Sequence, residues 1–396
     1  MRLRVLPVVV CVAVFYAVFV SMRADQYGVL WFVHLGSDFL SSAHSSHVIR
    51  PSIGAQSTVG YDGQYYFALA ADPAHAHDYM QGSAGVIYSR VFYPAVSRAF
   101  SLGSVRALPY AMLIINLLAV LAGTAAVALW LVKRGFSAWP ALLYGLFPGL
   151  VFTTFRDLTE PLAFGLAALS MLAFDVTRTR RLALSAVLLA LAVLTRETIV
   201  PFALAGAAAL ALEDRRSIQA GPWWPRWRRA AAFAAATCGP LLLWRLVVKL
   251  WINQPTQEVG HERGWILPLH GIWSWWPFDT EHWLIVLTVT VPTLVAAAGA
   301  LVLLRERRSL VLAGLLLVNV LLYVVWLPRS VYVDYAAASR AAIGVVLAAL
   351  YCLPAWWRSA WRGRVLVAAG AFALSIAGYL IAAELFGLNG IRDITM

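Results

Sequence analysis

Acidic residues, charged residues in general and cysteines are scarce in this chain of 396 residues. Only 19 residues are Asp or Glu and 13% are charged, whereas 61% are hydrophobic. So few charges cannot cover the surface of a soluble globular domain, which excludes that class. The three cysteines, Cys11, Cys238 and Cys352, fall far apart within apolar stretches. This spacing excludes a disulfide framework and a cysteine-based metal site.

Several catalytic motifs are missing as well. The chain contains no G-x-x-x-x-G-K-[ST], no G-x-G-x-x-G and no Ser-His-Asp order, so nucleotide hydrolysis and acyl transfer are set aside. No internal repeat recurs at a fixed period, and this weakens the analogy with transporters built from inverted repeats.

Long apolar runs dominate what is present. A helix that spans a bilayer needs about 20 mostly apolar residues, and the sequence predicts eleven such helices, the fourth to sixth of them short. They cover residues 5–22, 107–132, 138–154, 161–176, 182–195, 198–212, 230–251, 283–304, 309–327, 335–354 and 365–386. We therefore expect an all-α polytopic integral membrane protein that contacts membrane lipids.

The distribution of charge predicts the orientation in the membrane. Lys and Arg collect in cytoplasmic loops near the ends of spans. With the N-terminus in the cytoplasm, the short inner loops carry more than half of the 31 basic residues and few acids, while all eight histidines lie outside. The net charge of +12 is thus explained by topology, and nucleic acid is not expected as a partner. The long outer segments 23–106 and 252–282 place function on the extracytoplasmic face.

The first outer segment contains the leading candidate for chemistry, Asp62, within Tyr61-Asp62-Gly63-Gln64-Tyr65-Tyr66. A carboxylate framed by aromatic rings is suited to act as general base toward a sugar hydroxyl, with Tyr61, Gln64 and Tyr65 binding the sugar. Gly63 would let a substrate approach the backbone. The alternative is that Asp62 only caps a helix that follows it. Further on, residues 86–102 have an apolar face at helical spacing and predict an interfacial amphipathic helix, bent or restarted at Pro94.

A second polar group, Arg156, Asp157 and Glu160, forms a compact charged turn between two predicted spans. It could be a simple helix start capped by Asp157 or Thr159. Because charge is costly at a membrane boundary, a polar pocket is the better interpretation of the three residues together.

Two further groups supply arginines. Arg196 and Glu197 lie at the outer junction of two short predicted helices, either as a structural ion pair or with Glu197 orienting Arg196 toward a lipid phosphate. Arg329, Asp334 and Arg340 form the last group, and Arg340 lies among small residues that permit close helix packing. A phosphate leaving group needs positive charge, so we expect one or more of Arg90, Arg156, Arg196, Arg329 and Arg340 to face it, with Arg196 as the first choice.

The residues from Tyr61 to Ala70, followed by Tyr88-Ser89-Arg90-Val91-Phe92-Tyr93-Pro94, resemble the first outer loop of bacterial GT-C-type membrane glycosyltransferases related to the GPI-mannosyltransferase-like group. Asp157 to Leu162 and Leu194 to Glu197 are similar to later landmarks of that group. The resemblance implies a GT-C-like bundle with amphipathic helices in its first outer loop. It assigns residues 1–210 to a catalytic module and leaves 211–396 as additional transmembrane helices.

The resemblance also implies an activity: transfer of a sugar from a polyprenyl-phosphate donor to a cell-envelope glycan or glycolipid acceptor, outside the bacterial inner membrane. Asp62 would be the base, and a lone base favours inversion. Many GT-C enzymes have two neighbouring acids where this chain has Asp62 alone, so no cofactor is required and a role for a divalent metal stays open. The alternatives are a lipid-linked glycan flippase or transporter, with Arg and Glu along a path, and a non-catalytic assembly protein of a surface polymer.

Overall fold

The computed structural model describes residues 2–43, 48–49, 53–80, 84–213, 224–254, 267–326 and 329–358. Within these ranges the regular secondary structure is helical, apart from one isolated bridge between Gly36 and Ser57. The prediction of an all-helical protein is confirmed for this part of the chain. The last predicted span, 365–386, lies outside the described residues.

The helices follow one another along the whole described chain. The α-helices are α1 (Arg2–Tyr27), α2 (Leu30–Val33), α3 (Ser37–Ala43), α4 (Gly63–Ala71), α5 (Ala84–Ser89), α6 (Phe92–Phe100), α7 (Leu108–Lys133), α8 (Leu142–Gly145), α9 (Pro148–Thr154), α10 (Glu160–Ala173), α11 (Thr179–Thr195), α12 (Val200–Glu213), α13 (Trp224–Ile252), α14 (His270–Trp273), α15 (Thr280–Ile285), α16 (Val291–Arg305), α17 (Leu310–Leu321), α18 (Tyr335–Ala341) and α19 (Ile343–Trp357). Short 3₁₀ or π segments are η1 (Ala76–Tyr79), η2 (Trp139–Ala141), η3 (Glu197–Ile199), η5 (Val286–Thr290), η6 (Leu322–Trp326) and η7 (Arg329–Tyr332).

Four helical segments are long and apolar enough to cross a membrane, and a fifth candidate is the pair α18 and α19, bent by 47°. The four are Arg4–Tyr27, Leu108–Lys133, Trp227–Ile252 and Thr280–Arg305. Shorter apolar helices occupy Glu160–Ala173, Glu197–Leu212 and Leu310–Val325. The described chain therefore has four to five candidate spans by length and composition, fewer than the eleven that the sequence predicts.

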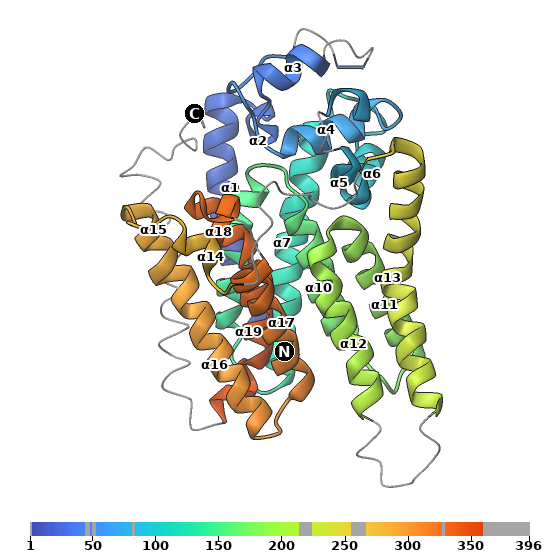
Figure 1. Ribbon diagram of the computed structural model, residues 1–396, viewed down its shortest axis with the longest axis vertical. Helices are drawn as coiled ribbons and strands as arrows, with labels where there is room; N and C mark the ends of the chain where they lie inside the picture. Colours follow the sequence, from blue (N-terminus) through green and yellow to red (C-terminus); the bar gives the residue numbers. More distant parts are fainter. Residues whose placement is uncertain are drawn as a thin grey trace.

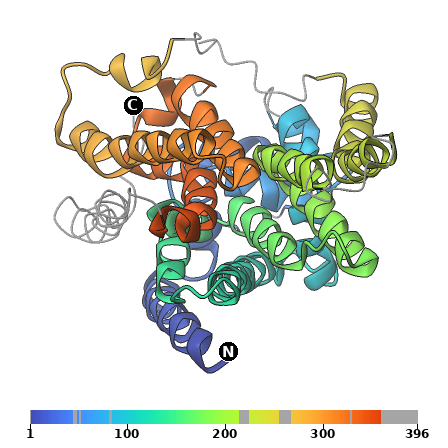
Figure 2. The ribbon, with the colours of Figure 1, turned by 90° about the horizontal axis from the view of Figure 1, so that it is seen from below.

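The long helices run side by side, and the short helices α2 to α6 gather at one end of the bundle (Figure 1). We call this the loop end and the opposite end the far end. Seen along the bundle, α10 to α13 form a group on one side and α16 to α19 lie on another (Figure 2). Helix α7 packs against α10 at very short range, because a Cβ on Gly165 would lie 2.6 Å from the carbonyl oxygen of Ala119. Small residues at such contacts allow helices to approach closely in a membrane.

The predicted helix over 86–102 is two helices, and the break is not at Pro94. Helix α5 ends at Ser89 and α6 begins at Phe92, so the chain bends at Arg90, whose side chain turns into the interior. Pro94 lies in the first turn of α6, where a missing N–H is tolerated. Phe100 is 62% exposed, which fits a helix that lies at an interface.

Candidate functional site

Helix α4 begins directly after Asp62 and is fixed by its close contact with the turn before α10. A Cβ on Gly63 would lie 2.2 Å from the carbonyl oxygen of Arg156 and 2.8 Å from that of Val33. Only glycine fits there, so Gly63 serves helix packing, and the expectation that it admits a substrate to the backbone is corrected. The amide of Tyr61 donates to the carbonyl of His34 at 3.0 Å, which fixes the entry into α4.

Asp62 occupies the N-cap position of α4, but its side chain makes no cap hydrogen bond to that helix, so the expected side-chain cap is not present. Its Oδ2 accepts a hydrogen bond from Nη1 of Arg340 at 2.9 Å, and its side chain is 40% exposed. Oδ1 has no hydrogen-bond partner among the residues that the structure describes. Burial opposes ionisation of Asp62, but the charge and hydrogen bond of Arg340 outweigh it and hold the pKa of the carboxyl below its ordinary range.

Glu160, the first residue of α10, joins two arginines. Its side chain is 1% exposed, its Oε1 lies 3.1 Å from Nη1 of Arg196, and the same oxygen accepts from Nε of Arg340. Nη1 of Arg196 also donates to Oγ1 of Thr159 at 3.1 Å. The hydroxyl of Thr159 therefore binds Arg196, and it makes no cap hydrogen bond to the first turn of α10. The helix start and the charged turn that the sequence predicts are both present, but the side chain of Thr159 does not cap the helix.

A third carboxylate binds a third arginine. Arg90 donates from Nε and Nη2 to the two carboxylate oxygens of Glu197, at 3.1 and 2.6 Å. Its Nη1 donates to the hydroxyl of Tyr66 at 3.1 Å. This bidentate geometry is the strong form of an arginine–carboxylate pair. Tyr66 was not among the residues singled out from the sequence, although it ends the same aromatic motif.

Six residues, which we call the ionic cluster, thus meet at the loop end: Asp62, Arg90, Glu160, Arg196, Glu197 and Arg340. Arg340 reaches it because α18 packs tightly on α9, where a Cβ on Gly149 would lie 2.4 Å from the carbonyl oxygen of Ser339. The cluster contains three cations and three anions, so each buried charge is compensated. The pairing differs from the sequence-based expectation, because Arg196 contacts Glu160, Glu197 contacts Arg90, and no ion pair joins Arg196 to Glu197.

The other predicted sugar-binding residues near Asp62 differ in their exposure and in the partners that they contact. Tyr61 packs edge-on against Phe152 and Tyr65 against Phe39, and both remain half-buried. Gln64 is buried and points away from the cluster, because its side chain accepts from the amide of Gly36 and donates to the carbonyl of Val59. Gln64 therefore holds the loop before α4, and its expected contact with a sugar finds no support in this geometry.

Three predicted site residues lie apart from the ionic cluster. The guanidinium of Arg156 lies 4.6 Å from the ring centroid of Trp31, and that of Arg329 lies 4.0 Å from the ring of Trp275. Asp157 is fully buried, has a left-handed φ of 47°, and neither carboxylate oxygen has a hydrogen-bond partner among the described residues. Burial raises the pKa of Asp157 well above its ordinary value. The charged turn is therefore divided: Glu160 belongs to the cluster, while Arg156 and Asp157 do not.

No group of three or more His, Cys, Asp or Glu side chains is placed to hold a metal ion in the described ranges. The carboxylates of the ionic cluster are each bound by arginine, which leaves Asp62 Oδ1 as its open acceptor. Comparisons of the chain with protein-family models, curated proteins and solved structures give no match. The functional interpretation therefore rests on the residues and their geometry.

Proposed function

We propose that this protein is a GT-C-type glycosyltransferase that moves a sugar from a polyprenyl-phosphate donor to a cell-envelope glycan or glycolipid acceptor. The observation that carries the proposal is the open oxygen of Asp62 beside Arg340, Arg196 and Arg90 at one end of an apolar helical bundle. A base for a hydroxyl and guanidinium groups for a phosphate are the two requirements of this transfer.

In the proposed reaction the acceptor hydroxyl oxygen forms a bond to the anomeric carbon of the donor sugar. The bond from that carbon to the phosphate oxygen breaks, and the lipid phosphate leaves with the electron pair. The hydroxyl proton passes to Oδ1 of Asp62. A single displacement of this kind inverts the anomeric configuration, and the arginines stabilise the charge on the leaving phosphate.

Arg340 has two roles in this proposal: it pairs with Asp62 in the free protein, and it binds the donor phosphate during the reaction. In the free protein its contact with Asp62 lowers the basicity of the carboxylate. A donor phosphate competes for the same guanidinium, and a weaker Arg340–Asp62 pair makes Asp62 a better base. Donor binding would thus activate the base that the transfer requires.

The membrane arrangement forms part of the same proposal. We place the loop end outside the bacterial inner membrane, with the N-terminus in the cytoplasm and eleven helices crossing the bilayer. Residues 1–210 would then form the catalytic module, although Arg340 contributes to the cluster from the second part of the chain. A polyprenyl chain is apolar and would reach the cluster from the lipid phase.

The position of the buried charges supports transfer over transport. In the described part of the chain, the buried Asp, Glu, Lys and Arg residues are Asp72, Arg90, Arg156, Asp157 and Glu160. All five belong to segments at the loop end, whereas a translocation path needs polar groups along the bundle.

The deciding experiment incubates purified protein in detergent with a polyprenyl-phosphate sugar labelled in the sugar, together with a glycolipid extract of the source envelope. We expect label in the glycolipid and release of polyprenyl phosphate. The companion measurement follows the labelled lipid across proteoliposome membranes without acceptor. Movement of intact donor lipid with no transfer would contradict the proposal and favour a flippase.

A further inference from the structure

A second polar site lies at the far end of the bundle, opposite the ionic cluster. It is a cavity of about 500 Å³ bounded by the ends of α7, α16, α17 and α19. Four arginines line it: Arg134, Arg307, Arg308 and Arg358. None of its lining residues is acidic, so the cavity has a strong excess of positive charge.

The walls of the cavity combine this charge with apolar and aromatic surface. Leu312, Pro354 and Ala355 contribute aliphatic groups, while Trp130 and Tyr351 meet edge to face at 4.7 Å between ring centroids. The guanidinium of Arg134 lies 3.4 Å from the ring centroid of Trp130 and is thereby fixed in place. Nη1 of Arg134 also donates to the carbonyl of Trp130 at 3.5 Å, and stacking leaves the remaining N–H groups in the guanidinium plane available to an anion.

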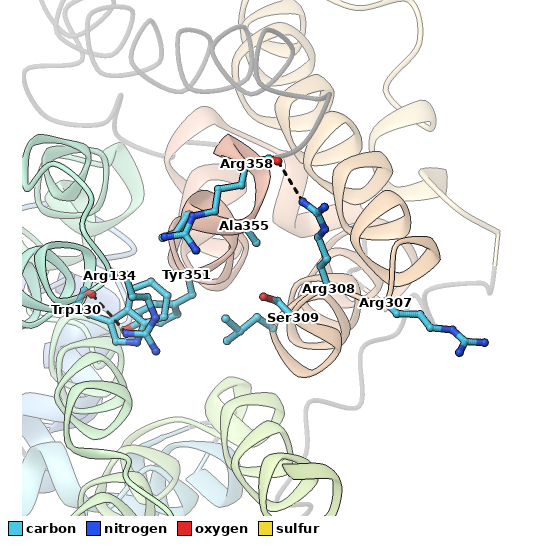
Figure 3. Close-up of a pocket in the computed structure, with 10 residues that line it drawn as sticks. Trp130, Arg134, Arg307, Arg308, Ser309, Tyr351, Ala355 and Arg358 are labelled. Atoms are coloured by element: carbon cyan, nitrogen blue, oxygen red, sulfur yellow. Dashed lines mark hydrogen bonds between the residues drawn. The ribbon is translucent and has the colours of Figure 1, made fainter. Parts of the chain in front are cut away.

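The four arginines differ in how far they are already neutralised. Arg308 donates to the carbonyl of Arg358 at 3.1 Å and lies 3.3 Å from a carboxylate oxygen of Glu306. No ion pair joins Arg134 or Arg358 to an acid among the described residues. In Figure 3 the Arg358 side chain extends toward Arg134 and Tyr351, whereas that of Arg307 extends away from the cavity.

Basic residues at this end are expected from topology alone. Topology accounts for their number but not for their convergence. Arg134, Arg308 and Arg358 come from three separate helix ends and border one cavity, and mutual repulsion opposes that arrangement unless an anion occupies it. Helix carboxyl ends offset part of the repulsion, because Arg134 and Arg358 follow the last residues of α7 and α19.

We propose that this cavity binds the phosphate of an anionic phospholipid headgroup in the leaflet at the far end of the bundle. Arg134, Arg308 and Arg358 would hold the phosphate, and the aliphatic wall would contact the glycerol and upper acyl chain. Basic pockets between membrane helices are suited to such headgroups. The cavity lies at the opposite end from Asp62, so the inference is independent of the glycosyl transfer proposed above.

The test measures the melting temperature and native mass spectra of purified protein with added phosphatidylglycerol, phosphatidylcholine or inorganic phosphate. We expect phosphatidylglycerol to bind and to raise the melting temperature more than phosphatidylcholine does. Arg134→Gln and Arg358→Gln should each weaken its binding about fivefold. The matched control, Arg305→Gln, removes the same charge from an exposed arginine at the same end of the bundle that does not line the cavity, and it should leave binding near that of the unchanged protein.

A steric variant keeps the test valid if an arginine variant folds poorly. Ala355→Leu retains every charge but fills part of the cavity, and it should reduce phosphatidylglycerol binding. Equal stabilisation by inorganic phosphate would overturn the lipid assignment and identify a soluble phosphate compound as the ligand. Equal binding of both phospholipids, or equal loss in Arg305→Gln, would overturn the site itself.

Discussion

Arg340 and Asp62 are 278 positions apart in the sequence, yet Nη1 of one lies 2.9 Å from Oδ2 of the other. The same guanidinium binds Glu160, so one side chain from α18 joins α4 to α10. This contact ties the second part of the chain to the loop that contains the candidate base. A separation into an independent catalytic module at residues 1–210 and accessory helices would leave Asp62 without its partner.

Replacement of the candidate base tests its role directly. Asp62→Asn retains the size of the side chain and an acceptor for Arg340 but removes proton acceptance, so turnover should fall by about 10²-fold or more. The matched control is Asp38→Asn, an exposed carboxylate of the same outer segment. Transfer of labelled sugar by both purified variants is the measurement. Near-normal turnover in Asp62→Asn would restrict Asp62 to a structural part.

The pair of Arg196 with Glu160 predicts a specific compensation. Arg196→Met removes one of two cations from a carboxylate that is 1% exposed, and breaking such a buried pair costs about 3–5 kcal/mol. Adding Glu160→Gln should restore part of that stability, and adding Glu197→Gln should not, because Glu197 binds Arg90. Melting temperatures in detergent test this difference. Activity should stay low in the stabilised double variant, since the guanidinium for the phosphate is gone.

Gly63 offers a test of how α4 is positioned. A Cβ there would lie 2.2 Å from the Arg156 carbonyl oxygen, so Gly63→Ala should force α4 away from the turn and destabilise by about 1–3 kcal/mol. Gly54→Ala is the control, because its Cβ would meet nothing within 4 Å. Thermal unfolding of the two variants should separate them clearly, and a neutral Gly63→Ala would disprove the close contact.

The Asp62–Arg340 pair also predicts the pH dependence of stability. The folded-state pKa of Asp62 lies below the ordinary value of 3.8, so its contribution is present above that value and is lost as the pH falls through the folded pKa. The side chain is 40% exposed and solvent screens the pair, so we expect a small effect. Between pH 5 and about 3, the unchanged protein should lose more melting temperature than Asp62→Asn. Parallel curves would contradict the pairing.

Placement of the two bundle ends can be tested with single cysteines. In a background with Cys11, Cys238 and Cys352 changed to alanine, Thr58→Cys lies at the loop end and Ser137→Cys beyond the far end of α7, and both parent residues are exposed. An impermeant thiol reagent added to intact cells should label Thr58→Cys and spare Ser137→Cys. The opposite pattern would place the candidate site in the cytoplasm.

The sequence alone determined the class of protein and the residue types of the candidate site. Apolar runs predict helices because each backbone polar group in lipid must bond within its own segment, and the described helices follow those runs. Asp62, Glu160, Arg196 and Arg340 were identifiable because a charge in an apolar chain is costly and conspicuous. The number of long spans was not determined by the sequence alone. The described chain has four to five candidate spans where eleven are predicted, because short and broken helices such as α8 and α9 depend on their neighbours.

Only the tertiary structure decided which charges pair. Adjacent residues such as Arg196 and Glu197 invite a pairing in sequence, but η3 begins between them and sends their side chains to Glu160 and Arg90. The close contact of Gly63 with the carbonyl of Arg156 could not be predicted from the sequence either. Ion pairing acts over a few ångströms of space and not along the chain. The packing of α4, α10 and α18 therefore decided the partners of Asp62, Glu160 and Arg340, and the approach of the α5–α6 bend to the α11–η3 junction paired Arg90 with Glu197.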